Sequence, residues 1–359
     1  MTFGGGYGTW VGGGVAIGFT DMVGNRVAQA VLQTPGQLQD VAGELFYLDR
    51  SRRWNWGAEA YHVPFVGAFA NYTNATFNVQ GQPVAGSVVT QTLQRTIFDD
   101  VQLLAQYPLS STRRLEFRAG YQHIGFGVEV DSMFFVGPTY LGRNVTRPPV
   151  AAGLGFAAGA AAYVRDYSFF GFTSPVAGGR YRFEVAPYAG SLNYQTALVD
   201  YRHYFFARPL TVAVRGVFVG RFGPDGESVR LQPMFIGQPS LLRGYDASDF
   251  SVHDCTARPL SADSCPEYTR LSGSRIGVVN AELRIPLFGT EQFGLIRFPY
   301  LPTEIAPFVD AGVAWNTSGP LSLRFDQGTP DRVPVFSSGV AARFNLFGAV
   351  VLEVYWVHP

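Results

Sequence analysis

The sequence predicts an all-β protein, a transmembrane antiparallel β-barrel of about sixteen strands, of which we expect about fifteen in this chain. Composition is the first reason. Of the 359 residues, 15% are charged and 15% are aromatic, whereas ordinary soluble domains carry about 25% charged residues. Glycine contributes 42 residues, about 12% against a usual ~7%. This composition excludes a disordered chain and a helical coiled coil.

Alternation of polar and apolar side chains is the second reason. Many segments of roughly ten residues alternate with period two, which is the pattern of a strand with two different faces. The segment RYRFEVA places charged residues on one face and apolar residues on the other: Arg180, Arg182 and Glu184 against Tyr181, Phe183 and Val185. The same alternation occurs at 114–122, 199–205 and 275–285.

The chemistry of the two faces favours a membrane barrel over a soluble all-β fold. The polar faces carry Arg with Glu or Asp, which suits paired charges in a closed lumen, and the apolar faces suit lipid with aromatic girdles. A transmembrane strand needs about 9–11 residues, whereas no apolar run reaches the 18 or more residues of a spanning helix. A closed barrel also satisfies every backbone polar group within lipid.

Turn signals divide the chain into about fifteen strands. Because single-chain bacterial barrels have even strand numbers, either one strand is miscounted or a last strand is missing beyond Pro359; we favour the missing strand. The expected strands are 8–20, 25–34, 40–49, 54–65, 67–79, 87–107, 113–131, 151–166, 179–190, 193–207, 209–221, 274–287, 304–316, 335–346 and 349–358. The one very long connection runs from about 222 to 273.

Several functions are not indicated by any motif. The 27 basic residues are balanced by 27 acidic residues, so the chain lacks the basic footprint of a nucleic-acid-binding protein. We find no catalytic signature, no histidine spacing typical of a metal site and no cofactor motif. We therefore expect no enzyme activity, no metal and no cofactor. The start of the chain has no signal peptide pattern, and we expect a single barrel domain over 1–359.

Two cysteines lie in the long connection. Cys255 and Cys265 are ten residues apart in a polar segment. This spacing favours a loop disulfide in an oxidising compartment, with two free thiols as the alternative.

The long connection and the strands after it carry motifs of one known family. The loop reads MFIGQPSLLRGYD, which places Arg243, Gly244 and Tyr245 together. The second strand after it reads PFVDAG, with Phe308, Asp310 and Gly312. The strand directly after it reads ELRIP from Glu282. This combination resembles the BamA/TamA superfamily, also called the bacterial surface antigen barrels.

The resemblance implies a function in the outer membrane. It implies an integral bacterial outer-membrane barrel that inserts, assembles or translocates polypeptide, with lipid and nascent outer-membrane proteins as partners. Family members usually carry POTRA domains before the barrel, and we find none in the chain. The alternative is therefore a passive anchor or channel for a fused N-terminal domain.

The motif residues predict a lock between the loop and the barrel wall. Alternation places Asp310 and Glu282 in the lumen, where an isolated carboxylate is costly unless it is paired. The Arg243 guanidinium suits bidentate bonds to such a carboxylate. We expect it to bind Asp310 or Glu282, with a solvated Arg243 as the alternative. Gly244 would allow a close backbone approach, and Gly312 would leave room for the loop tip.

The glycine-rich first strand predicts a weak seam. Gly12, Gly13 and Gly14 offer little packing to a neighbouring strand. If this strand meets the last one, their closure is weak. The resemblance implies a lateral gate there, through which nascent strands exchange by β-augmentation. The alternative is a frayed first strand.

Overall fold

The structure is a computed structural model, and it describes residues 2–5, 9–34, 40–79, 81–246, 269–319, 321–322 and 332–358. Its regular elements within these ranges are all β-strands. None of the described residues form a helix that is long and apolar enough to cross a membrane. The strands are β1 (Thr2–Gly5), β2 (Thr9–Thr20), β3 (Arg26–Thr34), β4 (Ala42–Asp49), β5 (Asn55–Val79), β6 (Gln82–Ser110), β7 (Arg113–Val136), β8 (Thr139–Thr146), β9 (Leu154–Asp166), β10 (Phe169–Phe170), β11 (Pro175–Gly190), β12 (Tyr194–Ala207), β13 (Leu210–Phe222), β14 (Met234–Phe235), β15 (Ser272–Gly273), β16 (Arg275–Gly289), β17 (Ile296–Arg297), β18 (Thr303–Trp315), β19 (Val335–Leu346) and β20 (Val350–His358).

The chain divides into two compact units, described separately here. Unit 1 contains Met1–Gln106, Phe117–Gly159 and Tyr188–Leu192. Unit 2 contains Tyr107–Glu116, Ala160–Pro187 and Asn193–Pro359. The expectation of one barrel domain over 1–359 stays a prediction.

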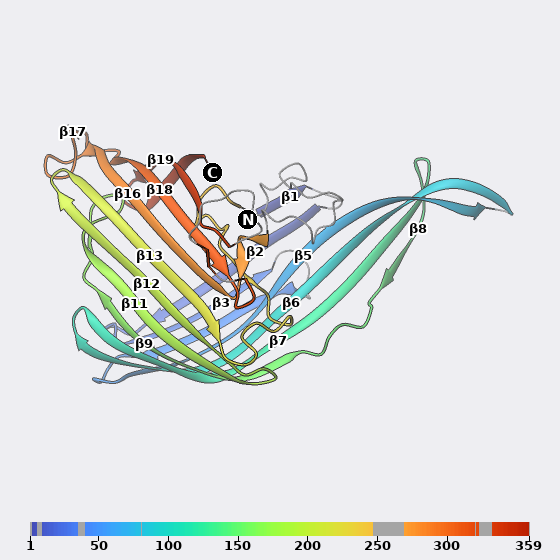
Figure 1. Ribbon diagram of the computed structural model, residues 1–359, viewed down its shortest axis with the longest axis horizontal. Coiled ribbons are helices and arrows are strands. Elements are labelled where there is room, and N and C mark those ends of the chain that lie inside the picture. Colours follow the sequence, from blue (N-terminus) through green and yellow to red (C-terminus); the bar gives the residue numbers. More distant parts are fainter. Residues whose placement is uncertain are drawn as a thin grey trace. The chain divides into compact units, whose positions relative to one another are not determined.

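Unit 1 is built from antiparallel neighbours in chain order. β1 pairs with β2, β2 with β3, β3 with β4, β4 with β5 and β5 with β6. Figure 1 shows β5 and β6 as one long hairpin, which is paired without interruption from Asn55 opposite Gln106 to Val79 opposite Gln82. The adjacent hairpin joins β7 to β8. A strand of 25 residues is far longer than the 9–11 residues that a bilayer requires.

Two of the expected strand assignments are corrected in this unit. The segments 54–65 and 67–79 are a single strand, β5, because Gly67 continues the ladder opposite Gln94. Strand β8 was not expected at all. Most of its side chains are exposed, so it lacks the alternation between a covered and an uncovered face on which the prediction depends.

One face of unit 1 exposes large apolar side chains. Val15, Ile17 and Phe19 alternate along β2 and are 50–68% exposed. Leu32, Leu45 and Leu103 are exposed to a similar extent on the following strands. An apolar surface of this kind is rare in a soluble monomer and is typical of contact with lipid.

Unit 2 is a second antiparallel ladder, and it carries the candidate site. Its strands pair in the order β12, β13, β16, β18, β19 and β20, drawn from green to red in Figure 1. Along β18, burial alternates as expected: Glu304, Phe308 and Asp310 are buried, whereas Pro307 and Val309 are exposed. The face with Asp310 is called the polar face below.

Candidate functional site

The segment after β13 packs back onto the polar face of unit 2 through apolar side chains. The short strand β14 pairs with β15, with Met234 opposite Gly273. Ile236 and Leu242 are fully buried in a cluster with Val217, Val278 and Ala314. This cluster places the tip of the segment, 236–245, directly over β16 and β18.

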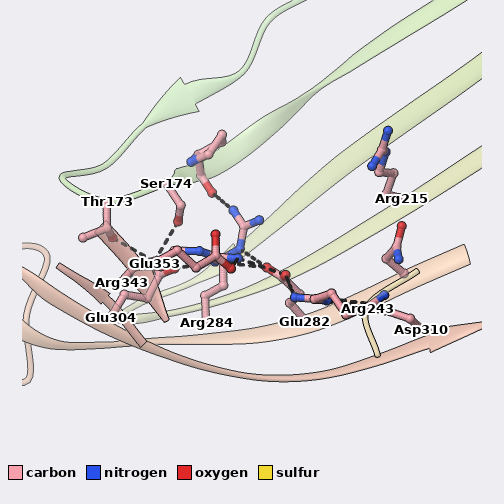
Figure 2. Close-up of polar contacts among 12 residues, drawn as sticks. Thr173, Ser174, Arg215, Arg243, Glu282, Arg284, Glu304, Asp310, Arg343 and Glu353 are labelled. Carbon is pink, nitrogen blue, oxygen red and sulfur yellow. Dashed lines mark hydrogen bonds and ion pairs between the residues drawn. The ribbon is translucent and has the colours of Figure 1, made fainter. Parts of the chain in front are cut away.

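Arg243 stands at that tip and binds both carboxylates that the sequence offered as alternatives. Its Nε and Nη2 donate to the two carboxylate oxygens of Asp310, both at 2.7 Å. Its Nη1 donates to Glu282 Oε1 at 2.8 Å, as Figure 2 shows. The guanidinium also lies over the ring of Phe308, 3.4 Å from the ring centroid. Three of the five guanidinium N–H groups and one face of the guanidinium plane are thus engaged by protein.

The neighbouring motif residues, Gly244, Tyr245 and Gly312, lie close to this contact. Gly244 has a φ of 86°, and a Cβ there would lie 2.9 Å from Val357 of β20. The Tyr245 hydroxyl donates to the Phe336 carbonyl of β19 at 2.7 Å. A Cβ on Gly312 would meet Ile236 at 3.1 Å and Leu242 at 3.3 Å, so this glycine leaves room for the loop tip.

The pair with Arg243 belongs to a larger network. Arg343 donates to Glu282 at 3.0 Å, to Glu304 at 2.9 Å and to Glu353 at 3.1 Å. Arg284 donates to Glu282 at 2.9 Å. On the far side, Ser174 and Thr173 donate to Glu304 at 2.7 and 3.1 Å. Four strands, β16, β18, β19 and β20, are therefore joined on one face, and the loop tip is joined to them (Figure 2).

The energetic value of this network depends on its completeness. Asp310 is 0% exposed and Glu304 is 3% exposed. Burying such charges is costly, so an intact buried pair is only weak evidence of stability. Removing one partner nevertheless costs about 3–5 kcal/mol, because the other charge is left buried and unpaired. The network thus fixes the position of the loop more than it adds stability.

Sequence reasoning missed part of this network. Arg343, Arg284 and Glu353 were not named as candidates, although their strands were expected and the alternation at 275–285 was recognised. In the structure, Arg343 lies directly opposite Glu304 on β18 and Glu353 on β20. The odd or even position of each residue along its strand indicates which face it occupies. Identifying its partner also requires the strand register, which the sequence of a single strand does not reveal.

Outside the strands, Glu227 anchors the start of the long connection. It accepts hydrogen bonds from Ser274 Oγ and from the Thr317 amide, both at 2.7 Å. Burial raises the pKa of Glu227, but these hydrogen bonds outweigh burial and leave its pKa below the usual value. The connection is therefore held near both of its ends.

The remaining candidates are placed as follows. Gly12 lies opposite Thr2 of β1, and Gly13 and Gly14 lie opposite Thr34 and Gln33 of β3. The seam between the first and last strands stays a prediction, because β2 belongs to unit 1 and β20 to unit 2. Cys255 and Cys265 lie outside the described residues. Among the described residues, no group of His, Cys, Asp and Glu could hold a metal ion.

The antiparallel ladders and the loop bound to the polar face define the class of protein, an all-β protein built on large antiparallel sheets. No family model matches the chain, and no curated protein matches it either. Solved structures do match the chain, among them the following two.

One is BamA from Haemophilus ducreyi lacking POTRA domains 1–3, with a TM-score of 0.48 and 15% identity, covering 97% of this chain and 66% of that chain. The other is CdiB from Acinetobacter baumannii, with a TM-score of 0.51 and 12% identity, covering 96% of this chain and 52% of that chain. The chain thus spans about half the length of CdiB. At this identity the likeness to CdiB shows the fold, and it confirms the predicted fold class.

Proposed function

We propose that the chain is an integral bacterial outer-membrane β-barrel of the BamA/TamA type, acting in the insertion, assembly or translocation of polypeptide. Arg243 locks the loop tip to the lumen carboxylates Asp310 and Glu282. The proposal assigns no catalytic reaction, cofactor or metal to the chain. Its partners are outer-membrane lipid and nascent or translocated polypeptide.

The observation that carries the proposal is the Arg243 contact itself. A passive barrel can hold a loop with any combination of surface contacts. Here one guanidinium is divided between two carboxylates on neighbouring strands, at 2.7 and 2.8 Å, and lies against an aromatic ring. The residues of the motif that resembles the BamA/TamA barrels are thus the same residues that form this buried contact.

Membrane insertion is supported by the exposed apolar face. In unit 1 the exposed large apolar side chains include Val15, Ile17 and Phe19 on β2, Leu32 on β3 and Leu45 on β4. In unit 2 the exposed positions of β18 include Val309. An apolar surface on several consecutive strands matches a hydrocarbon environment, and the outer membrane is where strands rather than helices span.

A passive anchor or channel for a fused N-terminal domain is the second candidate. The two candidates differ in whether the barrel changes the folding of another protein. They can therefore be separated by measuring that effect directly.

The experiment uses the full chain reconstituted in liposomes together with an unfolded outer-membrane client protein. The measurement is the rate at which the client becomes folded and protease-resistant. We expect the wild-type chain to fold the client several-fold faster than empty liposomes. The Asp310→Asn variant should lose most of that gain, because the loop tip loses its main anchor.

Arg182→Gln is the matched control, since Arg182 binds Glu116 and Glu184 on β7 and β11 and does not contact the loop. It should retain the wild-type rate. A wild-type rate equal to that of empty liposomes, with the barrel inserted and folded, would reject assembly activity and leave the passive anchor.

A further inference from the structure

A polar cavity lies beside the loop tip on the polar face of unit 2. Its volume is about 490 Å³. Five guanidinium groups line it, those of Arg202, Arg215, Arg243, Arg284 and Arg343. The lock described above uses the last three. The first two come from β12 and β13 and pair with Asp200 instead of with the carboxylates of the lock.

The two ends of the cavity have different charge balances. At the lock end, three arginines face four carboxylates, Glu282, Glu304, Asp310 and Glu353. At the other end, Arg202 and Arg215 share the single carboxylate of Asp200, whose Oδ2 lies 2.7 Å from Arg202 Nη2 and 3.1 Å from Arg215 Nη2. This end therefore carries one positive charge in excess.

The two cations are forced together by the strand register. Arg202 lies directly opposite Arg215 in the β12–β13 ladder. Like charges in this position destabilise a sheet, so a second anion beside them would relieve a repulsion that Asp200 relieves only in part. Their side chains are 35% and 24% exposed, which leaves both accessible from the cavity.

Donors remain at this end after the known contacts are counted. A guanidinium offers five N–H groups. Arg215 gives two bonds to Asp200 and one to the Ser240 carbonyl. Arg202 gives two bonds to Asp200 and lies next to the Tyr204 hydroxyl. Within the described part of the chain, each arginine thus retains two N–H groups for a ligand.

An acceptor completes the site. Asn280 lies opposite Arg215 in the next ladder and lines the same cavity. Its Nδ2 donates to the Leu241 carbonyl at 2.9 Å, which fixes the orientation of the amide. Its Oδ1 is buried and has no hydrogen-bond partner among the described residues. A buried acceptor without a donor is costly, so a ligand O–H would satisfy it.

We propose that Arg202, Arg215 and Asn280 bind a tetrahedral oxyanion that still carries a proton, of which phosphate or a phosphate monoester is the simplest form. The anionic oxygens accept from the two arginines, and the remaining P–OH donates to Asn280 Oδ1. Sulfate has the same shape but no proton to donate. The site adjoins the loop tip, since the Ser240 and Leu241 carbonyls accept from Arg215 and Asn280, but it does not depend on the proposed function.

Calorimetric titration of the detergent-solubilised full chain at pH 6 tests the site. The probes are inorganic phosphate, glycerol phosphate and sulfate. We expect saturable phosphate binding that is ~10-fold tighter than sulfate binding, since one hydrogen bond to a charged partner is worth about that factor. Comparison of phosphate with glycerol phosphate shows whether the free ion or an ester is preferred.

Arg202→Gln should weaken phosphate binding ~10-fold or more, because it removes the excess charge and leaves Asp200 balanced by Arg215. Arg202→Lys keeps the charge and should weaken binding less. Asn280→Leu should remove the preference for phosphate over sulfate. Arg182→Gln, on the same face of another strand, is the matched control and should bind as the wild type does.

Two results would overturn the proposal. One is unchanged phosphate affinity in Arg202→Gln with the barrel folded. The other is equal affinity of the wild type for sulfate and phosphate. Neither result bears on the liposome assay with Asp310→Asn, so the oxyanion site and the proposed function fail separately.

Discussion

At the residue scale, the central contact is the buried pair of Arg243 and Asp310. Asp310→Asn keeps the shape of the side chain but removes its charge, which leaves Arg243 with only Glu282 as a full counter-charge. We expect a loss of about 3–5 kcal/mol in the free energy of unfolding and protease cleavage of the loop. Thermal unfolding followed by circular dichroism, with limited proteolysis, measures both.

Asp131→Asn is the matched control for that substitution. Asp131 is buried, but its partner Arg143 is 54% exposed, so the charge left without its partner is solvated and the loss should be about 0–1 kcal/mol. A destabilisation by Asp310→Asn that is no larger than that of Asp131→Asn would show that the lock does not hold the loop.

Gly312 tests the fit of the loop tip without touching any charge. Gly312→Ala adds a methyl group 3.1 Å from Ile236 and 3.3 Å from Leu242, and overpacking of this kind costs about 1–3 kcal/mol. Gly216→Ala is the control, because a Cβ there meets nothing within 4 Å. Equal unfolding temperatures for the two variants would mean that the loop tip does not pack on Gly312.

Glu227 gives a pH dependence at the entrance to the long connection. Burial raises its pKa, but hydrogen bonds from Ser274 and Thr317 lower it further, so the folded-state pKa lies below the unfolded value. The stabilisation is therefore present above the unfolded pKa of about 4.3 and is lost as the pH falls through the folded pKa. Glu227→Gln should remove this acid-dependent loss, measured as unfolding temperature between pH 6 and pH 3. Identical pH profiles for Glu227→Gln and the wild type would contradict the assignment.

At the scale of single elements, period-two alternation predicted most strands closely. The expected 335–346 and 193–207 match β19 and β12, since each has one covered and one uncovered face. The method failed where both faces are similarly exposed, as in β8, and where it divided one long strand in two at Val66, which continues the ladder opposite Arg95. It could not place Ile236 and Leu242, because their burial depends on the loop folding back onto strands distant in sequence.

The exposed face of β18 separates a membrane strand from a soluble one. Val309 is 54% exposed. In a bilayer, Val309→Arg should cost about 2–4 kcal/mol near the midplane, whereas an exposed position of a soluble protein tolerates it within about 0.5 kcal/mol. Denaturant unfolding in lipid vesicles measures the difference. Val309→Leu is the control, and an equal free energy for Val309→Arg and Val309→Leu would contradict a lipid-facing β18.

At the scale of the whole molecule, the balance of 27 basic and 27 acidic residues reflects pairing on the polar faces. In unit 2 the network around Glu282 and Arg343 uses strong pairs on neighbouring strands. The motif residues also reach the last strand, since Gly244 lies against Val357 and Arg343 binds Glu353. The lock and the position of β20 are thus mechanically coupled within this unit.

That coupling bears on the predicted seam between the glycine-rich first strand and the last one, and β20, the last strand in the described part of the chain, is the candidate partner to test. The native cysteines are first removed by Cys255→Ser and Cys265→Ser. One cysteine is then placed in β2, for example by Ala16→Cys, and is combined with a cysteine at Val351 or at Val354 of β20. A gate predicts partial disulfide formation in more than one register, because glycine gives the first strand little packing against a neighbour. It also predicts that Asp310→Asn changes the distribution of registers, since the loop that contacts Val357 is released.

The positive control is a pair within unit 2, Ala342→Cys with Val354→Cys, which lie opposite each other in the β19–β20 ladder and must crosslink in any state of the seam. Variants with a single cysteine can crosslink only between two molecules, so they measure the intermolecular background. Complete crosslinking in one register, unchanged by Asp310→Asn, would indicate permanent closure and contradict a gate. Absence of any β2–β20 crosslink, with the control pair fully oxidised, would show that these two strands do not meet, and exchange of nascent strands would then require a different edge.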